Sequence, residues 1–198
     1  PLIGGEAAVR DLRRLRFAVD TVNGVEGTAV TGREADIMAK AMDSSVLSTS
    51  LGRLMDTLSY SLGVCDRRTY DGEPAMKLEK LLTEGTELPG FEAEVIGGTV
   101  MTIPLFLDWP EASPADIARS VVSAALSALA DAACDAAEDS GIGAIGLSGG
   151  STYNRVVKAI VSGVASERGL ELISHDSIPN GDGGISVGQA AIAVRRFR

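Results

Sequence analysis

The chain has 198 residues, of which 45% are hydrophobic and 4% aromatic, and it carries a formal net charge of −9. This composition excludes a disordered chain, and the acidic balance argues against a broad nucleic-acid-binding surface. The basic cluster at residues 10–16 has helical spacing and predicts a helix face that is solvated or faces a partner.

The two cysteines, Cys65 and Cys134, match no zinc-ligand spacing and predict buried, reduced thiols in a cytoplasmic protein. No apolar run approaches the roughly 18 residues that a membrane span needs, and no signal peptide precedes the first helix. We therefore expect no membrane partner. Because the chain begins at Pro1 without a methionine, we expect a piece of a longer protein.

Hydrophobic periodicity predicts four helices in the first half of the chain. They cover Glu6–Val19, a segment after Thr31, Ser50–Gly63 and Glu73–Thr83. In the third helix the apolar stripe comprises Leu51, Leu54, Met55, Leu58 and Leu62. Gly63 is expected to end that helix in a left-handed conformation, and Met76 and Leu78–Leu82 are expected to face inward in the fourth.

In the middle of the chain the helical spacing of apolar residues gives way to continuous apolar runs typical of strands. Two apolar runs, Ala93–Ile96 and Thr99–Leu107, flank Gly97-Gly98 and predict a β-hairpin. Ser113-Pro-Ala-Asp116 predicts the start of a long alanine-rich helix that ends near Asp139.

The last third reads as a strand over 142–147, a helix over 152–167, a strand over 170–173 and a closing helix over 185–194. These elements form a β-α-β unit followed by a helix. We predict one compact α/β lobe, in which residues 84–90 come nearest to a hinge.

Two glycine turns precede helices in this unit. In the first, Gly149 and Gly150 would let a phosphate or nucleoside approach backbone N–H groups near a helix N-terminus, and Asn154 could point at the same ligand. An ordinary strand-to-helix turn and a surface Asn explain the same pattern, which is neither a P-loop nor a dinucleotide fingerprint.

In the second turn, Asp182 lies among Gly181, Gly183 and Gly184, where a carboxylate could bind a cation, orient a water or simply cap a helix. His175, the single histidine, favours a structural hydrogen bond. Gly72 precedes the fourth helix and could take a positive φ. The residue either forms part of the far wall of a nucleotide cleft or simply begins a helix.

Five motifs, taken together and in order, resemble the HypF carbamoyltransferase family of hydrogenase maturation. They are Pro1–Arg10, Thr49–Asp56, Tyr70–Glu79, Leu147–Gly150 with Asn154-Arg155, and Asp182–Ala190. The resemblance runs to about Ala193. It implies a ribonuclease-H-like α/β lobe of the actin, sugar-kinase and Hsp70 (ASKHA) superfamily, with inserted helices. Residues 1–198 would be the C-terminal portion of a carbamoyl-transfer domain that is incomplete here.

The resemblance also implies the chemistry. Upstream domains would use ATP and carbamoyl phosphate to make carbamoyl-adenylate. This domain would pass the carbamoyl group to the C-terminal cysteine of a HypE-like partner protein, on the way to a cyanide ligand. Gly72, Gly149, Gly150 and Asn154 match positions around the nucleotide, and Asp182 matches a ligand of a divalent metal, iron or zinc.

Two departures qualify the resemblance. The family has Asn where this chain has Gly181, and its paired metal histidines have no counterpart here. We therefore expect the other metal ligands and an N-terminal lobe upstream of Pro1, an exposed apolar face where that lobe packs, and no activity from this piece alone. No catalytic residue is assigned.

Two alternatives remain open. One is an O-carbamoyl or threonylcarbamoyl transferase of the same fold, although Tyr70-Asp-Gly-Glu-Pro argues against the branch that acts on tRNA. The other is a non-catalytic nucleotide-binding or scaffold module.

Overall fold

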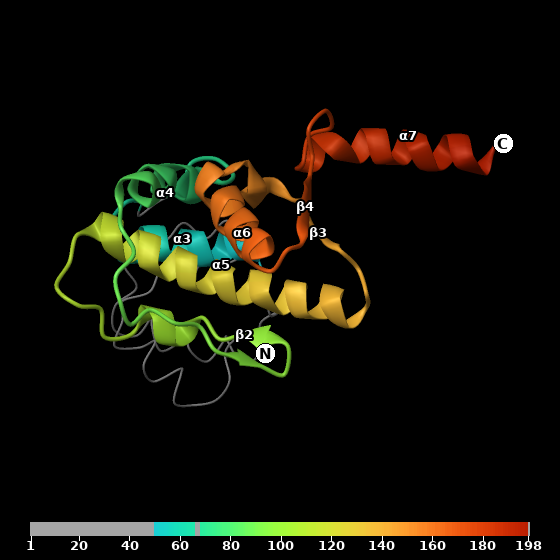
Figure 1. Ribbon diagram of the computed structural model, residues 1–198. Helices are drawn as coiled ribbons and strands as arrows, with labels where there is room; N and C mark the ends of the chain where they lie inside the picture. Colours follow the sequence, from blue (N-terminus) through green and yellow to red (C-terminus); the bar gives the residue numbers. More distant parts are fainter. Residues whose placement is uncertain (1–49, 66–67, 198) are drawn as a thin grey trace. The chain divides into compact units, whose positions relative to one another are not determined.

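The computed structural model of the protein describes residues 50–65 and 68–197 (Figure 1). It has two compact units, one up to Ala128 and one from Leu129, and the boundary falls inside helix α5 (Pro114–Asp139). The sequence predicts one compact lobe, whereas the structure divides into these two units. The helices expected over 6–19 and after Thr31 lie outside the described residues.

In the first unit, helix α3 (Leu51–Ser61) packs on helix α4 (Glu73–Glu84). Their buried apolar side chains are Met55, Leu58, Leu78 and Leu82. The expected left-handed glycine after α3 is confirmed, since Gly63 has φ +69°. The expectation for Met76 is wrong: it is 62% exposed, because a position two residues before the buried Leu78 lies on the opposite side of a helix.

The predicted hairpin is present as β1 (Val95–Ile96) paired antiparallel with β2 (Thr99–Val100). Gly97 and Gly98 both have positive φ, as a two-residue hairpin turn of this kind requires. The prediction that the second strand continues to Leu107 is wrong, because Ile103–Phe106 forms the 3-10 helix η1. Pro104 lacks the N–H that a strand ladder needs, and the apolar run buries its side chains as a helical turn instead.

Helix α5 starts where the sequence predicts. The Ser113 hydroxyl donates to Asp116 Oδ2 at 2.7 Å and accepts from the Asp116 backbone N–H at 3.1 Å, a local capping arrangement. Within the described part of the chain, α5 is long and apolar enough to cross a membrane by length and composition, contrary to the expectation from sequence. However, 56% of its most apolar window is buried inside the protein, and a core helix passes the same test.

The segment after α4, expected as the nearest thing to a hinge, is held against α5. The backbone N–H and hydroxyl of Thr86 both donate to Asp116 Oδ1, at 2.8 and 2.9 Å. The Leu88 N–H donates to the Ser120 hydroxyl at 2.8 Å. The bond from the Thr86 N–H, followed by those from the Ser113 and Thr86 hydroxyls, lowers the pKa of Asp116. Residues 86–88 are therefore fixed rather than hinged.

In the second unit, strands β3 (Ala144–Leu147) and β4 (Glu171–Ser174) pair in parallel and helix α6 (Arg155–Glu167) contacts both. The predicted β-α-β order is confirmed. The helix expected from Thr152 begins later, because residues 150–153 form the 3-10 helix η2 (Gly150–Tyr153). Helix α6 buries Val156, Val157, Val161 and Ala165.

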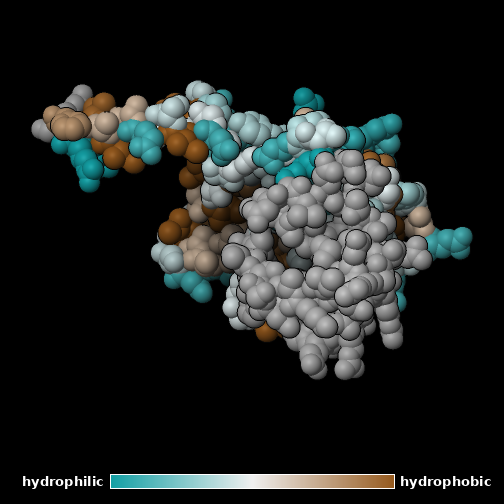
Figure 2. All heavy atoms as spheres, turned by 180° about the vertical axis from the view of Figure 1, so that it is seen from behind, coloured by the Kyte–Doolittle hydropathy of each residue, from teal (hydrophilic) through white to brown (hydrophobic). Residues whose placement is uncertain are grey.

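The chain closes with the 3-10 helix η3 (Asp182–Gly184) and helix α7 (Ile185–Arg196). Every described residue of α7 is exposed, and apolar side chains lie along its surface (Figure 2). They include Ile185, Ile192 and Val194, which are 56–60% exposed. The sequence predicts an exposed apolar face where a missing lobe packs; that α7 provides it stays a prediction.

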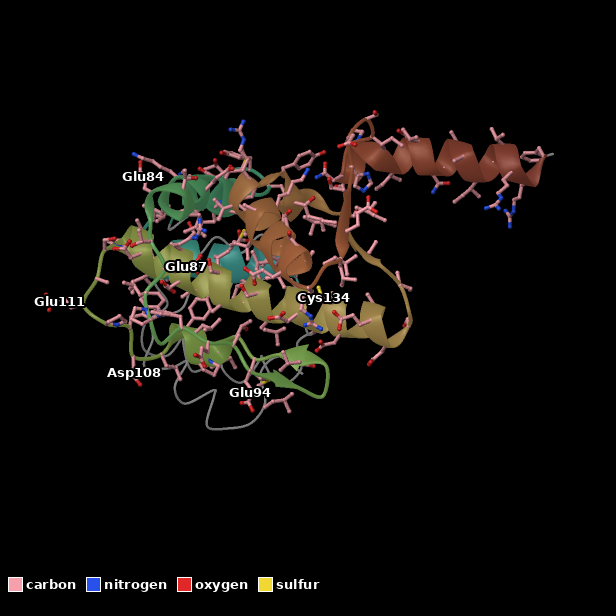
Figure 3. All side chains as sticks on the ribbon, in the orientation of Figure 1. Glu84, Glu87, Glu94, Asp108, Glu111 and Cys134 are labelled. Carbon is pink, nitrogen blue, oxygen red and sulfur yellow. The ribbon has the colours of Figure 1, made fainter. Side chains whose placement is uncertain are left out.

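Both cysteines are buried free thiols, as expected. Cys134 lies on α5 and is fully buried (Figure 3). Burial raises the pKa of its thiol, which disfavours the thiolate and so its reactivity.

An ion-pair cluster joins the end of α6 to α5 in the second unit. The Arg168 guanidinium contacts Asp135 and Glu138, each at 2.7 Å, and Asp131 at 3.5 Å. Hydrogen bonds to Glu138 and then Asp135 raise the pKa of Arg168.

We expect Arg168→Ala to lower the melting temperature, because it leaves three carboxylates near one another on α5. The deficit should shrink at high salt, since screening weakens exposed charge interactions. Thermal unfolding at low and high salt measures it, with Lys158→Ala, an exposed change on the same helix, as control. A deficit equal at both salt concentrations would contradict the electrostatic origin.

Candidate functional site

The candidate site is the edge of the β3–β4 sheet at which both strands end. Because Leu147 pairs with Ser174, the next residues, Ser148 and His175, leave the sheet side by side. His175 Nε2 lies 2.9 Å from Ser148 Oγ, and both residues are exposed. The structural hydrogen bond predicted for His175 is therefore confirmed. Ligands of open α/β sheets bind outside the carboxyl ends of parallel strands, which is this edge.

The glycine turn after β3 is tightly constrained. Gly149 has φ +105°, which only glycine adopts without strain, and its carbonyl accepts a 2.7 Å bond from the Thr152 hydroxyl. The Gly149 N–H donates to the Asn180 carbonyl at 2.9 Å, so in this structure that amide is already engaged. Gly150 is exposed, with open space where a side chain would lie. Phosphate binding by Gly149 and Gly150 stays a prediction.

The turn that follows β4 is bonded to the first turn. Asn180 Nδ2 donates to the Thr152 hydroxyl at 2.6 Å, in addition to the bond from Gly149. The Gly181 N–H donates to the Tyr153 phenol oxygen at 3.3 Å. The sequence predicts two separate glycine turns; the structure brings them together through Thr152, Tyr153 and Asn180, which sequence reasoning did not assign to the site.

Asp182 is the first residue of η3 and is exposed. Among the described residues, neither η3 nor α7 has a side-chain cap, so helix capping does not explain Asp182. The described parts of the chain also contain no group of three His, Cys, Asp or Glu side chains that could hold a metal ion. Asp182 and its described neighbours therefore do not fit iron or zinc on their own, because such a site needs about three or four protein ligands.

Asn154 is the N-cap of α6. Its Oδ1 accepts from the backbone N–H groups of Val156 at 2.9 Å and Val157 at 3.3 Å, and the residue is buried. It is therefore not a surface Asn. It satisfies two N–H groups at the helix start that would otherwise lack partners. A contact with the nucleotide stays a prediction.

Gly72 belongs to the first unit, whereas the other candidate residues belong to the second. It precedes α4 with φ +79°, so the predicted positive φ is confirmed, and there is open space where a side chain would lie. Its part in nucleotide binding stays a prediction.

Next to Gly72, Glu73 is a buried carboxylate, to which the sequence assigns only a place at the start of the helix. It accepts from the Thr69 backbone N–H at 2.6 Å, the Thr69 hydroxyl at 2.8 Å and Lys77 Nζ at 2.8 Å. These bonds, the one from Lys77 first, lower the pKa of Glu73 from 4.5 to about 2. The available signal was the Glu-to-Lys spacing of four residues on a helix.

Glu73 should make stability depend on acid pH. Its pKa is lower in the folded than in the unfolded chain, so its contribution is complete above about pH 4.5 and is lost as the pH falls toward 2. We expect Glu73→Gln to lower the free energy of unfolding at pH 7. Between about pH 4.5 and pH 2 the free energy of unfolding of this variant should fall less steeply than that of the wild type. Denaturant unfolding at a series of pH values measures this. Glu92→Gln, an exposed change in the same unit, is the control; an unchanged slope in Glu73→Gln contradicts the assignment.

Taken together, the parallel strand pair and the two bonded glycine turns at its carboxyl edge define the class: an α/β domain whose glycine turns lie at the edge where ligands of open α/β sheets bind. Comparison with known proteins identifies the family. Residues 1–189 match the family described as carbamoyltransferase, Kae1-like domain, second subdomain. The chain belongs to this family.

Similar proteins of known name belong to the same family. The chain is 32% identical over 153 residues to the probable carbamoyltransferase HypF of Methanocaldococcus jannaschii, covering 75% of this chain and 20% of that protein. It is 30% identical to the carbamoyltransferase HypF of Rhodobacter capsulatus, covering 100% of this chain and 27% of that protein. The chain thus spans a fifth to about a quarter of the length of these relatives.

Solved structures agree as well. The crystal structure of T. kodakarensis HypF matches 79% of this chain, and 21% of that chain, with a TM-score of 0.70 and 35% identity. A full-length HypF in the phosphate- and nucleotide-bound form matches 100% of this chain, and 28% of that chain, with a TM-score of 0.67 and 27% identity. These likenesses confirm the predicted α/β fold class.

Proposed function

We propose that this chain is part of a cytoplasmic carbamoyltransferase of hydrogenase maturation. It would help to pass the carbamoyl group of carbamoyl-adenylate to the C-terminal cysteine of a HypE-like partner. The pair of bonded glycine turns at the carboxyl edge of β3 and β4 carries the proposal, because it supplies a rigid polar edge for a nucleotide. Family membership, and a relative solved in a nucleotide-bound form, support it.

The proposed reaction is an acyl-type transfer. The partner's thiolate attacks the carbamoyl carbon, and the bond between that carbon and the phosphate oxygen of AMP breaks. AMP leaves with the electron pair, and a thiocarbamate remains on the partner. The residues of this edge would bind and orient the nucleotide, so their contribution is positional.

The rest of the complete protein would supply what this chain lacks. ATP would be consumed in forming carbamoyl-adenylate, and an upstream lobe would complete the nucleotide site. A divalent metal, if Asp182 helps to hold it, needs its other ligands from outside the described residues. No nucleic acid and no membrane takes part in the proposed transfer.

The test uses the full-length protein with ATP, carbamoyl phosphate labelled in its carbonyl carbon, and the partner protein. We expect label on the partner's C-terminal thiol, and none when that cysteine is replaced by serine. Parallel reactions supply a small-molecule hydroxyl acceptor, or tRNA with threonine, in place of the partner; label on either acceptor would favour an O-carbamoyl or threonylcarbamoyl transferase. No transfer and no nucleotide consumption would favour a scaffold module.

Within the same assay, Asp182→Asn tests the edge itself. This change keeps the size of the side chain and removes its charge, and we expect transfer to fall sharply. Asp176→Asn, an exposed aspartate in the same loop, is the matched control and should retain transfer. Equal activity of the two variants would remove Asp182 from the site.

A further inference from the structure

Tyr153 is exposed yet firmly engaged. It is the last residue of η2, and its side chain is 59% exposed. Its phenol oxygen nevertheless accepts the backbone N–H of Gly181 at 3.3 Å. The residue bonded in this way immediately precedes Asp182.

The Tyr153 ring also occupies the space next to Gly181. A Cβ built on Gly181 would lie 3.2 Å from Tyr153 Cε2 and 3.6 Å from Gly150 Cα, closer to the ring than nearly all real contacts. The backbone does not demand glycine at this position, because Gly181 has φ −95°, which any residue adopts. The aromatic ring, rather than the backbone conformation, therefore crowds a side chain at position 181, and the ring would have to shift by a few tenths of an ångström to admit one.

Two successive residues of the second turn are thus attached to the first turn. Asn180 is held by Thr152 and Gly149, and Gly181 is held by Tyr153. A single attachment would let the chain pivot about it, whereas two in sequence fix the direction in which the backbone enters η3. That direction places Asp182.

We propose that Tyr153 is a positioning residue for the Asp182 turn, and that glycine at position 181 is its structural counterpart. The phenol holds the Gly181 amide, and the ring keeps its present place only while position 181 carries no side chain. This deepens the proposed function and rests on it, since the turn belongs to the proposed nucleotide edge. The Asn that the family resemblance leads one to expect at position 181 would press against this ring and displace it by a few tenths of an ångström.

The first test separates the hydrogen bond from the ring. Tyr153→Phe removes the acceptor and keeps the ring, and Tyr153→Ala removes both. In the full-length protein labelled with ¹⁵N-glycine, we expect both variants to shift the Gly181 amide resonance. Titration calorimetry with ATP should show about two- to tenfold weaker binding, the size of one lost hydrogen bond. Tyr60→Phe, the same change on α3, should leave both readouts unaltered.

The second test is a double-mutant cycle with Gly181→Asn. Alone, this change should displace the ring, shift the Gly183 and Gly184 resonances and weaken ATP binding. In Tyr153→Ala/Gly181→Asn the clash is absent, so the double variant should bind more tightly than the product of the two single effects predicts. Multiplicative effects, or Gly181→Asn resonances like those of the wild type, would overturn the proposal.

These readouts also separate this proposal from the proposed function. If the wild-type protein binds no nucleotide, the proposed function fails, while the glycine resonances still decide whether Tyr153 and Gly181 are coupled. If the wild type binds ATP and neither the resonances nor the affinities respond to Tyr153, the positioning role fails alone.

Discussion

Gly85→Ala is expected to destabilise the first unit by about 3 kcal/mol, the upper part of the usual range for overpacking. An alanine Cβ at this position would lie 2.0 Å from the Ala115 carbonyl oxygen and 2.4 Å from its carbon, both backbone atoms of α5. Gly85 has φ −78°, so backbone strain plays no part and the effect is purely steric. Either α5 or the end of α4 must move.

The movement would break the bonds that follow in the chain. Residue 86 lies next to the clash, and its N–H and hydroxyl bonds to Asp116 Oδ1 need the present separation. Arg119 and Ser123 of α5 both donate to Glu87 Oε1, at 3.1 and 2.8 Å, and depend on the same spacing (Figure 3 labels Glu87).

Denaturant unfolding of Gly85→Ala beside wild type measures the loss. Gly163→Ala is the matched control, because Gly163 is exposed inside α6 with open space around it. That change should stabilise the protein by about 0.5–1 kcal/mol, the usual gain from replacing a helical glycine. If Gly85→Ala unfolds like wild type, the close approach of the Gly85 backbone to α5 is wrong.

Gly184→Ala is expected to abolish most nucleotide binding while changing global stability by less than about 1 kcal/mol. A Cβ on Gly184 would lie 2.3 Å from the Pro179 carbonyl oxygen, so the turn that carries Asp182 must open. The turn is largely exposed, so the chain can rearrange there without disturbing the core. We expect at least tenfold weaker ATP binding by the full-length protein.

The control for this change is Gly188→Ala in α7, where a side chain meets nothing within 4 Å. It should bind ATP as wild type does. Wild-type affinity in Gly184→Ala would show that the shape of the Asp182 turn does not matter for the nucleotide.

Local signals in the sequence predicted local structure well. Ser113 and Asp116 mark the start of α5 because their bonds span only three residues, and Gly97-Gly98 marks the hairpin because the turn type itself requires positive φ. The apolar run after Thr99 was misread because hydrophobicity alone does not separate a strand from a buried helical turn, and Pro104 was not weighed.

The site was predictable in its parts but not in its assembly. Gly149 and Asp182 stand out because glycines flank or adjoin them, yet the bonds that join their turns involve Thr152, Tyr153 and Asn180. Those pairs are about 28 residues apart in sequence, and only the folded β-α-β unit brings them together. For the same reason the sequence did not show that position 85 has no room for a side chain. The atoms that would meet it belong to Ala115, which is 30 residues away in the sequence.

Family resemblance contributed what the residues alone did not. Glycine turns predict a ligand edge, whereas membership of the carbamoyltransferase family is indicated by five motifs in order and is confirmed by the family match over residues 1–189. The metal, the partner and the acceptor cysteine stay proposals.

If the carboxyl edge of β3 and β4 holds the nucleotide, ATP should protect its two glycine turns from solvent. Hydrogen–deuterium exchange of the full-length protein, with and without saturating ATP, measures this protection. We predict slower exchange on ATP binding in peptides that cover residues 148–154 and 178–184, and no change in the hairpin at Gly97-Gly98. ATP binding without protection of the two turns, or with protection confined to other segments, would contradict the claim.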